Sequence, residues 1–92
     1  MIVKALGKEW DVNDCTYKQR RELHALNADV WWKNKEGDNF DVINYYFLLE
    51  EVRVIAGLGE DDFKGMDMAD VDQVLQAVFI DYLSLSKKAA GE

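Results

Sequence analysis

The chain has 92 residues, 49% of them hydrophobic, and carries 18 acidic against 11 basic residues for a formal net charge of -7. A chain of this length forms one domain, which buries roughly 60–65% of the surface that the unfolded chain exposes. The acidic balance argues against a stand-alone nucleic-acid binder and against an anionic membrane surface, because both contacts need clustered Lys and Arg.

Cysteine usage and hydropathy indicate where the protein works. Cys15 is the only cysteine, so no intrachain disulfide can form, as is typical of a reducing compartment. Charge interrupts the apolar N-terminus too soon for a signal peptide, and no run reaches the roughly 18 apolar residues of a membrane span. We therefore expect a cytoplasmic protein with no membrane partner.

The first twelve residues predict a β-hairpin. One short strand opens with Ile2 and Val3, and Trp10 and Val12 alternate in the next strand. The pair Gly7-Lys8 is the predicted tight turn, because glycine tolerates the positive φ that such turns require. Two strands alone are marginally stable, so we expect a helix to cover them.

A capped helix is predicted next, over residues 17–32. Thr16 and Gln19 fit a capping box, in which each side chain satisfies a free backbone N–H of the first turn. Three apolar residues then recur at spacings of three and four on one helix face: Leu23, Leu26 and Val30. Residues 34–39 break this pattern, with Gly37 as the predicted turn.

The middle helix is predicted over residues 40–56, capped by Asp38 or Asn39 and ended by Gly57 and Gly59. It carries two apolar stripes, the first being Val42, Tyr45, Leu49, Val52 and Ile55 or Ala56, and the second Phe40, Ile43, Phe47 and Val54. Together they cover more than the usual single face. Such a helix is either enclosed within the domain or covered by another chain.

The last helix has the clearest pattern. An acidic connector over residues 60–66, with a helical turn near Phe63, leads to Asp67 as N-cap. Apolar residues follow at helical spacing: Val71, Val74, Leu75, Val78, Phe79, Tyr82 and Leu83. The predicted fold is α+β, mainly helical, with an N-terminal β-hairpin followed by about three α-helices. We expect a single globular domain over residues 1–86 and a flexible tail over residues 87–92.

Candidate catalytic and metal-binding residues have simple structural explanations. His24 has no nucleophile or orienting carboxylate beside it on the predicted helix, and Cys15 fits a small structural hydrophobe. The acidic stretch 60–72 lacks the ligand rhythm and the closing Glu of a calcium loop. The basic run 18–21 fits a salt-bridged helix face or a dock for an acidic neighbour. We expect no enzyme activity, no metal and no cofactor.

Aromatic residues give the strongest functional signal. Trp31 and Trp32 are adjacent, so on a helix they point about 100° apart and cannot both occupy the centre of one face. The same holds for Tyr45 and Tyr46. Either one member of each pair is core and the other a partly exposed lid, or the outer members form an interface. The predicted partner-binding residues are Trp31, Trp32, Phe40, Ile43, Tyr46, Phe47 and Val54.

The opening stretch "ALGKEWDVNDCTYKQRREL" resembles the small tail assembly chaperones of tailed bacteriophages. It has a G-K-x-aromatic hairpin, then a T-x-x-[QE] helix in a small acidic chain. The resemblance covers residues 5–26 by motif and the rest by helix order. It implies a non-enzymatic assembly factor that coats the long helical tape measure protein, helps to recruit tail tube subunits and self-associates as a homo-oligomer. Many such proteins are also made in a longer, frameshifted form.

The net charge supports a different function as well. A small acidic inhibitor or nucleic-acid mimic would block a basic site on a host protein. Its binding would collapse with added salt, whereas docking of a helical client through apolar side chains would depend only modestly on salt.

Overall fold

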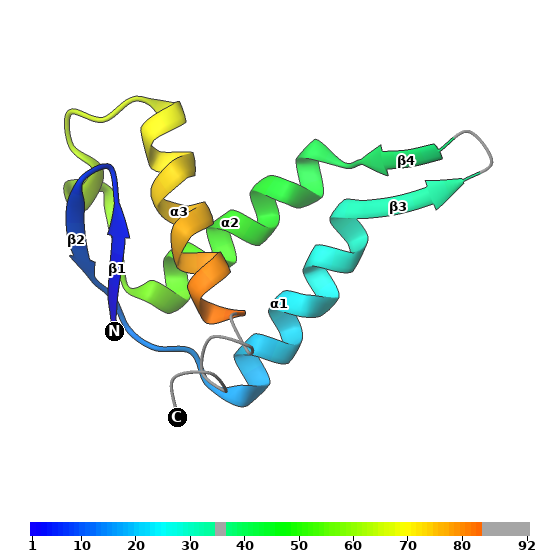
Figure 1. Cartoon of the computed structure of the whole chain (residues 1–92), viewed down its shortest axis with the longest axis horizontal. Helices are drawn as coiled ribbons and strands as arrows, with labels where there is room; N and C mark the ends of the chain where they lie inside the picture. The colour runs from blue at the N-terminus through cyan, green and yellow to red at the C-terminus, as the bar shows by residue number, and fades with distance from the viewer. Residues whose placement is uncertain (35–36, 84–92) are drawn as a thin grey trace.

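The computed structural model describes the backbone of residues 1–34 and 37–83, and the side chains of these residues apart from 32–39 (Figure 1). The elements in chain order are β1 (Ile2–Ala5), β2 (Lys8–Asp11), α1 (Tyr17–Val30), β3 (Trp31–Asn34), β4 (Gly37–Phe40), α2 (Val42–Ala56), the 3-10 helix η1 (Glu60–Phe63) and α3 (Met68–Tyr82). The predicted fold class is confirmed: an N-terminal hairpin precedes three helices. The predicted tail lies outside the described residues.

Strands β1 and β2 pair antiparallel, with Val3 opposite Trp10. The turn is Leu6-Gly7, at φ 55° and 69°, so the predicted Gly7-Lys8 turn is wrong by one residue. Two successive positive φ angles are the geometry that fits the twist of a two-residue hairpin. Val3 and Trp10 point into the core, and β1 packs on α3, which supplies the expected helical cover.

Helix α1 begins as predicted. The Gln19 N–H donates to Thr16 Oγ1 at 3.1 Å and the Thr16 N–H donates to Gln19 Oε1 at 2.8 Å, which completes the capping box. Its end was predicted wrongly, because the helix stops at Val30 and Trp31 is already extended, at φ -110° and ψ 123°.

A second hairpin, missed from the sequence, separates α1 from α2. Strands β3 and β4 pair antiparallel with Trp31 opposite Phe40, and the two rings lie 4.9 Å apart at their centroids. Aromatic residues favour strands, and cross-strand aromatic pairs stabilise them. The Asp41 N–H donates to the Val30 carbonyl at 2.8 Å, which closes the base of the hairpin. The hairpin extends away from the helices (Figure 1).

Helix α2 therefore starts later than predicted. Its N-cap is Asp41, whose Oδ1 accepts from the N–H groups of Ile43 and Asn44 at 3.1 Å each, so Asp38 and Asn39 were the wrong caps. Gly57 ends it as predicted, in the left-handed conformation at φ 79°. A Cβ at Gly57 would lie 2.8 Å from Asn13 Nδ2. Glycine is therefore needed there both for the left-handed backbone and for the lack of space.

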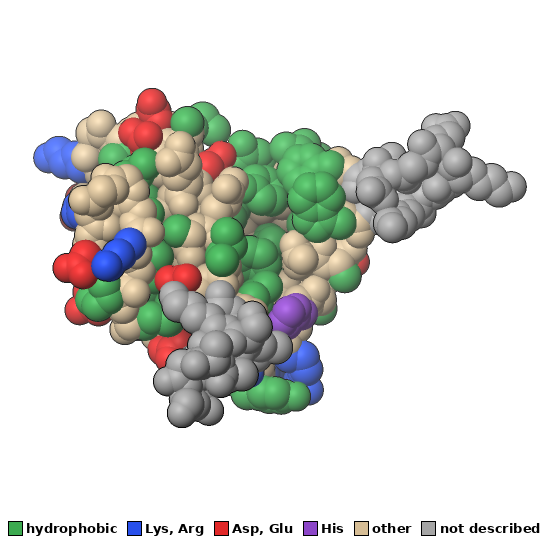
Figure 2. Space-filling view, viewed as in Figure 1, with side chains coloured by type: hydrophobic (Ala, Val, Ile, Leu, Met, Phe, Trp, Pro, Cys, Tyr) green, Lys and Arg blue, Asp and Glu red, His purple; other side chains and the backbone are tan. Residues whose placement is uncertain are grey.

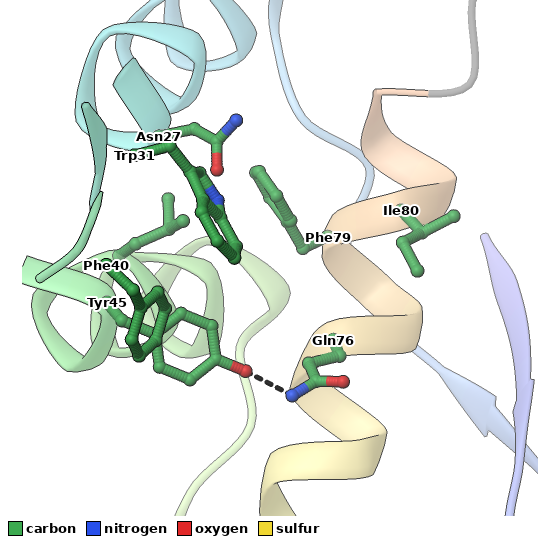
Figure 3. Close-up of a pocket in the computed structure, with 8 residues that line it drawn as sticks. Asn27, Trp31, Phe40, Tyr45, Gln76, Phe79 and Ile80 are labelled. Carbon is green, nitrogen blue, oxygen red and sulfur yellow. Dashed lines mark hydrogen bonds between the residues drawn. The ribbon is translucent and has the colours of Figure 1, made fainter. Parts of the chain in front are cut away.

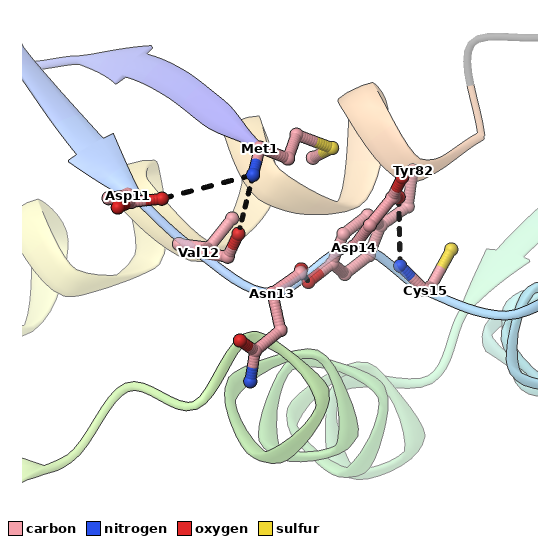
Figure 4. Close-up of polar contacts among 7 residues, drawn as sticks. All are labelled: Met1, Asp11, Val12, Asn13, Asp14, Cys15 and Tyr82. Atoms are coloured by element: carbon pink, nitrogen blue, oxygen red, sulfur yellow. Dashed lines mark hydrogen bonds and ion pairs between the residues drawn. The ribbon is translucent and has the colours of Figure 1, made fainter.

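The core lies around α2, against which both α1 and α3 pack. Its buried residues are Val3, Trp10, Val12, Leu23, Val30, Leu48, Leu49, Val52, Ile55, Ala56, Leu58, Val74, Leu75, Val78 and Tyr82. The first predicted stripe of α2 is buried except at its start, where Val42 is exposed and Tyr45 is half-buried. The Tyr82 hydroxyl donates to the Asn13 carbonyl and fixes the segment between β2 and α1 onto α3 (Figure 4). Among the described residues, no helix combines the length and apolarity needed to cross a bilayer.

Candidate protein-binding groove

An apolar groove opens between α1 and α3 above α2. Both outer helices pack on α2 while making at most slight contact with one another, so a recess of about 460 Å³ remains between them. Its lining residues are Asn27, Trp31, Phe40, Tyr45, Leu48, Gln76, Phe79 and Ile80 (Figure 3). None of these is charged, and only Asn27 and Gln76 carry an amide.

Aromatic rings form one wall of this groove. Trp31, from the start of β3, packs on Phe40 at the end of β4, and Phe40 packs on Tyr45 with centroids 5.3 Å apart. Trp31 nevertheless keeps 56% of its surface exposed. The second hairpin thus holds two large rings at the edge of the groove, where the packing of each ring on the next limits its freedom.

One hydrogen bond crosses the groove. The Gln76 side-chain amide on α3 donates to the Tyr45 hydroxyl on α2 (Figure 3). Burial raises the pKa of Tyr45 above its ordinary value of 10.0, so the hydroxyl is neutral at physiological pH. The contact marks one end of the groove, and the apolar rings lie beyond it.

A second apolar surface covers the outer side of α2. Ile43, Phe47 and Val54, here called the outer stripe, are 66%, 62% and 57% exposed. They share a helix face turned away from the buried residues, because their spacings of four and seven residues repeat the helical period. Glu50 lies beside them and forms an ion pair with Arg53, which also donates to the Leu58 carbonyl at 2.7 Å. Hydrogen bonding to Arg53 lowers the pKa of Glu50.

Five of the seven predicted interface residues fall on these two surfaces. Trp31 and Phe40 line the groove, whereas Ile43, Phe47 and Val54 form the outer stripe and Tyr46 lies exposed on the same helix. Phe40 is in a strand and not on the helical stripe assigned to it. The side chain of Trp32 lies outside the described side chains. Trp31 and Trp32 are both in β3, so the helical geometry predicted for the two tryptophans is wrong.

The predicted interface does not include the groove residues Asn27, Gln76 and Ile80, and Tyr45 and Phe79 were predicted only as members of apolar helix stripes. One signal was present: Ile80 is a large apolar residue off the regular stripe of α3, and it is exposed. The groove itself depends on how α1 and α3 diverge across α2. The spacing of residues along either helix does not reveal that divergence.

The residues with catalytic potential are apart. His24 is exposed on α1 and Cys15 is half-buried ahead of its N-cap, so nearly two turns of the helix lie between them. Among the described residues, no group of three or more His, Cys, Asp and Glu side chains is placed to hold a metal ion.

No family model matches the chain, and no curated protein or solved structure is significantly similar to it.

Proposed function

We propose that the chain is a non-enzymatic adaptor or assembly chaperone that binds a helical segment of a client protein in the groove between α1 and α3. The observation that carries this proposal is an uncharged, aromatic-walled groove left open between two helices of a small domain. An apolar helix face fits such a groove in the way that two packed helices fit one another.

Two physical features support a protein client. Trp31 is more than half exposed, and a large ring held at the rim of a groove buries much area on binding at little loss of rotamer freedom. The polar groups in the groove are few and uncharged, namely two amides, the Tyr45 hydroxyl and the Trp31 indole, so an apolar helix face would enter without leaving a buried charge unpaired.

The outer stripe suits a second copy of the chain. It lies on the face of α2 opposite the buried residues, so it stays accessible when the groove is filled. Exposed apolar surface of this kind marks interaction sites. We propose that copies of the chain associate through Ile43, Phe47 and Val54, and that several copies then hold one client by avidity. The resemblance to tail assembly chaperones would make that client the tape measure protein.

Two substitutions that each introduce a negative charge test client binding and self-association separately. Ile80→Glu places a carboxylate at the groove, and Phe47→Glu places one on the outer stripe; both positions are exposed. Met68→Glu, at an exposed position at the start of α3, is the matched control. The readouts are light scattering after size exclusion across a concentration series, and the soluble yield of a co-expressed tape measure protein from the same genome.

We expect Phe47→Glu to shift the chain toward monomer, Ile80→Glu to lower client yield while leaving the oligomer intact, and Met68→Glu to do neither. Client yield unaffected by Ile80→Glu would contradict the groove as the binding site. A strict monomer at every concentration would contradict the role of the outer stripe.

The acidic inhibitor remains a second candidate because the connector exposes Glu60, Asp61 and Asp62. Complexes held by those carboxylates would dissociate as salt rises, since exposed charges are screened within about 8 Å at physiological ionic strength. Persistence of client binding at high salt supports the groove and opposes the inhibitor.

A further inference from the structure

A cluster of basic side chains lies beside the groove on α1. Tyr17, Arg20, Arg21 and His24 line a shallow recess of about 230 Å³, and Tyr17 is 76% exposed. His24 is three residues before Asn27, which lines the groove, so the two adjoin on one side of the helix. We call Arg20, Arg21 and His24 the basic patch.

The basic patch has no acidic partner within the described part of the chain. The ion pairs there join Met1 to Asp11 and Glu50 to Arg53, and neither arginine of the patch is in one. The salt-bridged face considered from the sequence is therefore not formed among these residues. In a chain of net charge -7, two arginines on one helix that form no ion pair with the described residues can pair with carboxylates of a partner.

Helix stability does not account for cations at this position. The first turn of α1 contains Lys18 and Arg20 and no acidic residue, although the dipole of a helix disfavours cations near its N-terminus. Helix α3 follows the favourable rule, with Asp67 as its cap and Asp70 in its first turn. Figure 2 shows acidic side chains mainly toward the first hairpin and the connector, with apolar surface gathered between α1 and α3.

We propose that the helical segment bound in the groove carries acidic side chains about two helical turns from its apolar ones, and that Arg20 and Arg21 pair with those carboxylates. This inference rests on the proposed function and adds the charge pattern of the client helix. Arg20 is seven residues from Asn27, or roughly 10 Å along α1 at 1.5 Å per residue. A helix lying along α1 would span that distance in about seven residues of its own.

Carboxylates are the groups that an arginine pair recognises well, because the planar guanidinium donates two parallel hydrogen bonds to them. A nucleic acid is the poorer fit. The exposed Asp14 and Glu22 flank the patch, and the net negative charge of the chain repels an extended polyanion. A short acidic stretch at one end of a helix brings fewer negative charges near these carboxylates than an extended polyanion does.

The test is selection from a displayed library of helical peptides against the folded chain, with randomised charged and apolar positions. The selection is repeated with R20E/R21E, which reverses the charge of the basic patch. The control is K4E/K64E, which makes the same change of charge at exposed lysines elsewhere. Circular dichroism checks that each variant folds. A selected peptide is then measured by fluorescence anisotropy, and a 20-base-pair DNA duplex is measured in parallel.

We expect peptides selected by the wild type to carry Asp or Glu about seven residues from a paired apolar motif. Binding should weaken about tenfold in R20E/R21E and remain within about twofold in K4E/K64E, given the modest strength of exposed ion pairs. Apolar peptides without an acidic preference would overturn this inference and leave the proposed groove intact. A failure to select any peptide would overturn both. Duplex binding that depends on Arg20 and Arg21 and exceeds peptide binding would overturn the choice of a protein ligand.

Discussion

The two hairpins of this chain have the same length of strand and opposite roles. In the first, Val3 and Trp10 face the core and β1 packs on α3. The second extends from the ends of α1 and α2 (Figure 1) and holds Trp31 and Phe40 at an open groove. A tryptophan in a short strand therefore indicates neither core nor interface until the element that packs on the strand is known.

The largest expected contrast is between the two tryptophans. Trp10 is 6% exposed, packs on Phe63 and donates from its indole to the Ala5 carbonyl at 3.2 Å. We expect Trp10→Ala to reduce the free energy of unfolding by about 3–5 kcal/mol. Trp31→Ala should reduce it by less than about 1.5 kcal/mol, because its ring is already half in water, while weakening client binding strongly. Urea denaturation measures the first effect and anisotropy with a selected peptide the second.

The contrast fails if Trp31→Ala destabilises the domain as much as Trp10→Ala does. The second hairpin would then be part of the folding core, and loss of binding in that variant would carry no information about the groove.

The base of the second hairpin should depend on Asp41. This residue follows β4 and caps α2 through two backbone N–H groups, so Asp41→Ala should lower the free energy of unfolding by about 1 kcal/mol. The same change loosens the exit of β4, so binding to a selected peptide should weaken as well. Asp41→Asn retains an acceptor and serves as the control. Equal losses in both variants would show that the charge matters more than the cap.

The segment after the first hairpin should respond to alkaline pH through Tyr82. Burial raises the pKa of Tyr82 to about 12, so the folded state favours the neutral phenol. Stability should be unaffected below about pH 10, where the phenol is neutral in both states, and should fall as pH rises from 10 toward 12. Tyr82→Phe removes the hydrogen bond to Asn13, so the free energy of unfolding should fall by about 1 kcal/mol. The further loss of stability at alkaline pH should be smaller in this variant than in the wild type.

Denaturation at pH 8.5, 10 and 11.5 measures this difference. Tyr17→Phe is the control, because Tyr17 is exposed. Tyr45, whose pKa burial also raises, contributes in the same direction in every variant that retains it. An equal decrease in the free energy of unfolding at alkaline pH in the wild type and in Tyr82→Phe would contradict the prediction.

The smallest expected effect is a gain in stability from a substitution in the turn of the first hairpin. Leu6 has φ 55°, a conformation that a branched L-residue adopts only with strain. Leu6→Asn should therefore raise the free energy of unfolding by about 0.5–1 kcal/mol, since asparagine tolerates that conformation and suits this turn. Thermal unfolding would detect it. Leu6→Ala, which lacks that tolerance, is the comparison, and a similar gain in both would assign the effect to removal of an exposed leucine.

Much of the fold followed from local signals. The capping box of Thr16 and Gln19, the end of α2 at Gly57 and the cap of α3 at Asp67 each require only a few neighbouring residues. The second hairpin did not follow, because Trp31 extends the apolar period of α1 while its strand partner, Phe40, is nine residues away. Pairing between distant residues decides such a segment, and a helical period cannot reveal it.

The candidate site was predictable to a lesser degree. The surplus apolar residues of α2 indicated that a second surface existed, and Ile43, Phe47 and Val54 are exposed. The groove needed the placement of three helices. Phe79 belongs to the same regular apolar stripe as the buried residues of α3, and its spacing does not distinguish it from them, although it lines the open groove.

Helices α1 and α3 are joined through α2 and scarcely touch each other. The separation of the groove walls is therefore set by two packing surfaces, α1 on α2 and α3 on α2, with the Gln76–Tyr45 hydrogen bond as a further link from α3 to α2. A small rotation of α3 on α2 would widen the groove while separating few contacts between α1 and α3. If the groove binds a helix as proposed, we expect it to accept segments of different girth, because alanine-rich and leucine-rich helices require different widths of the same opening.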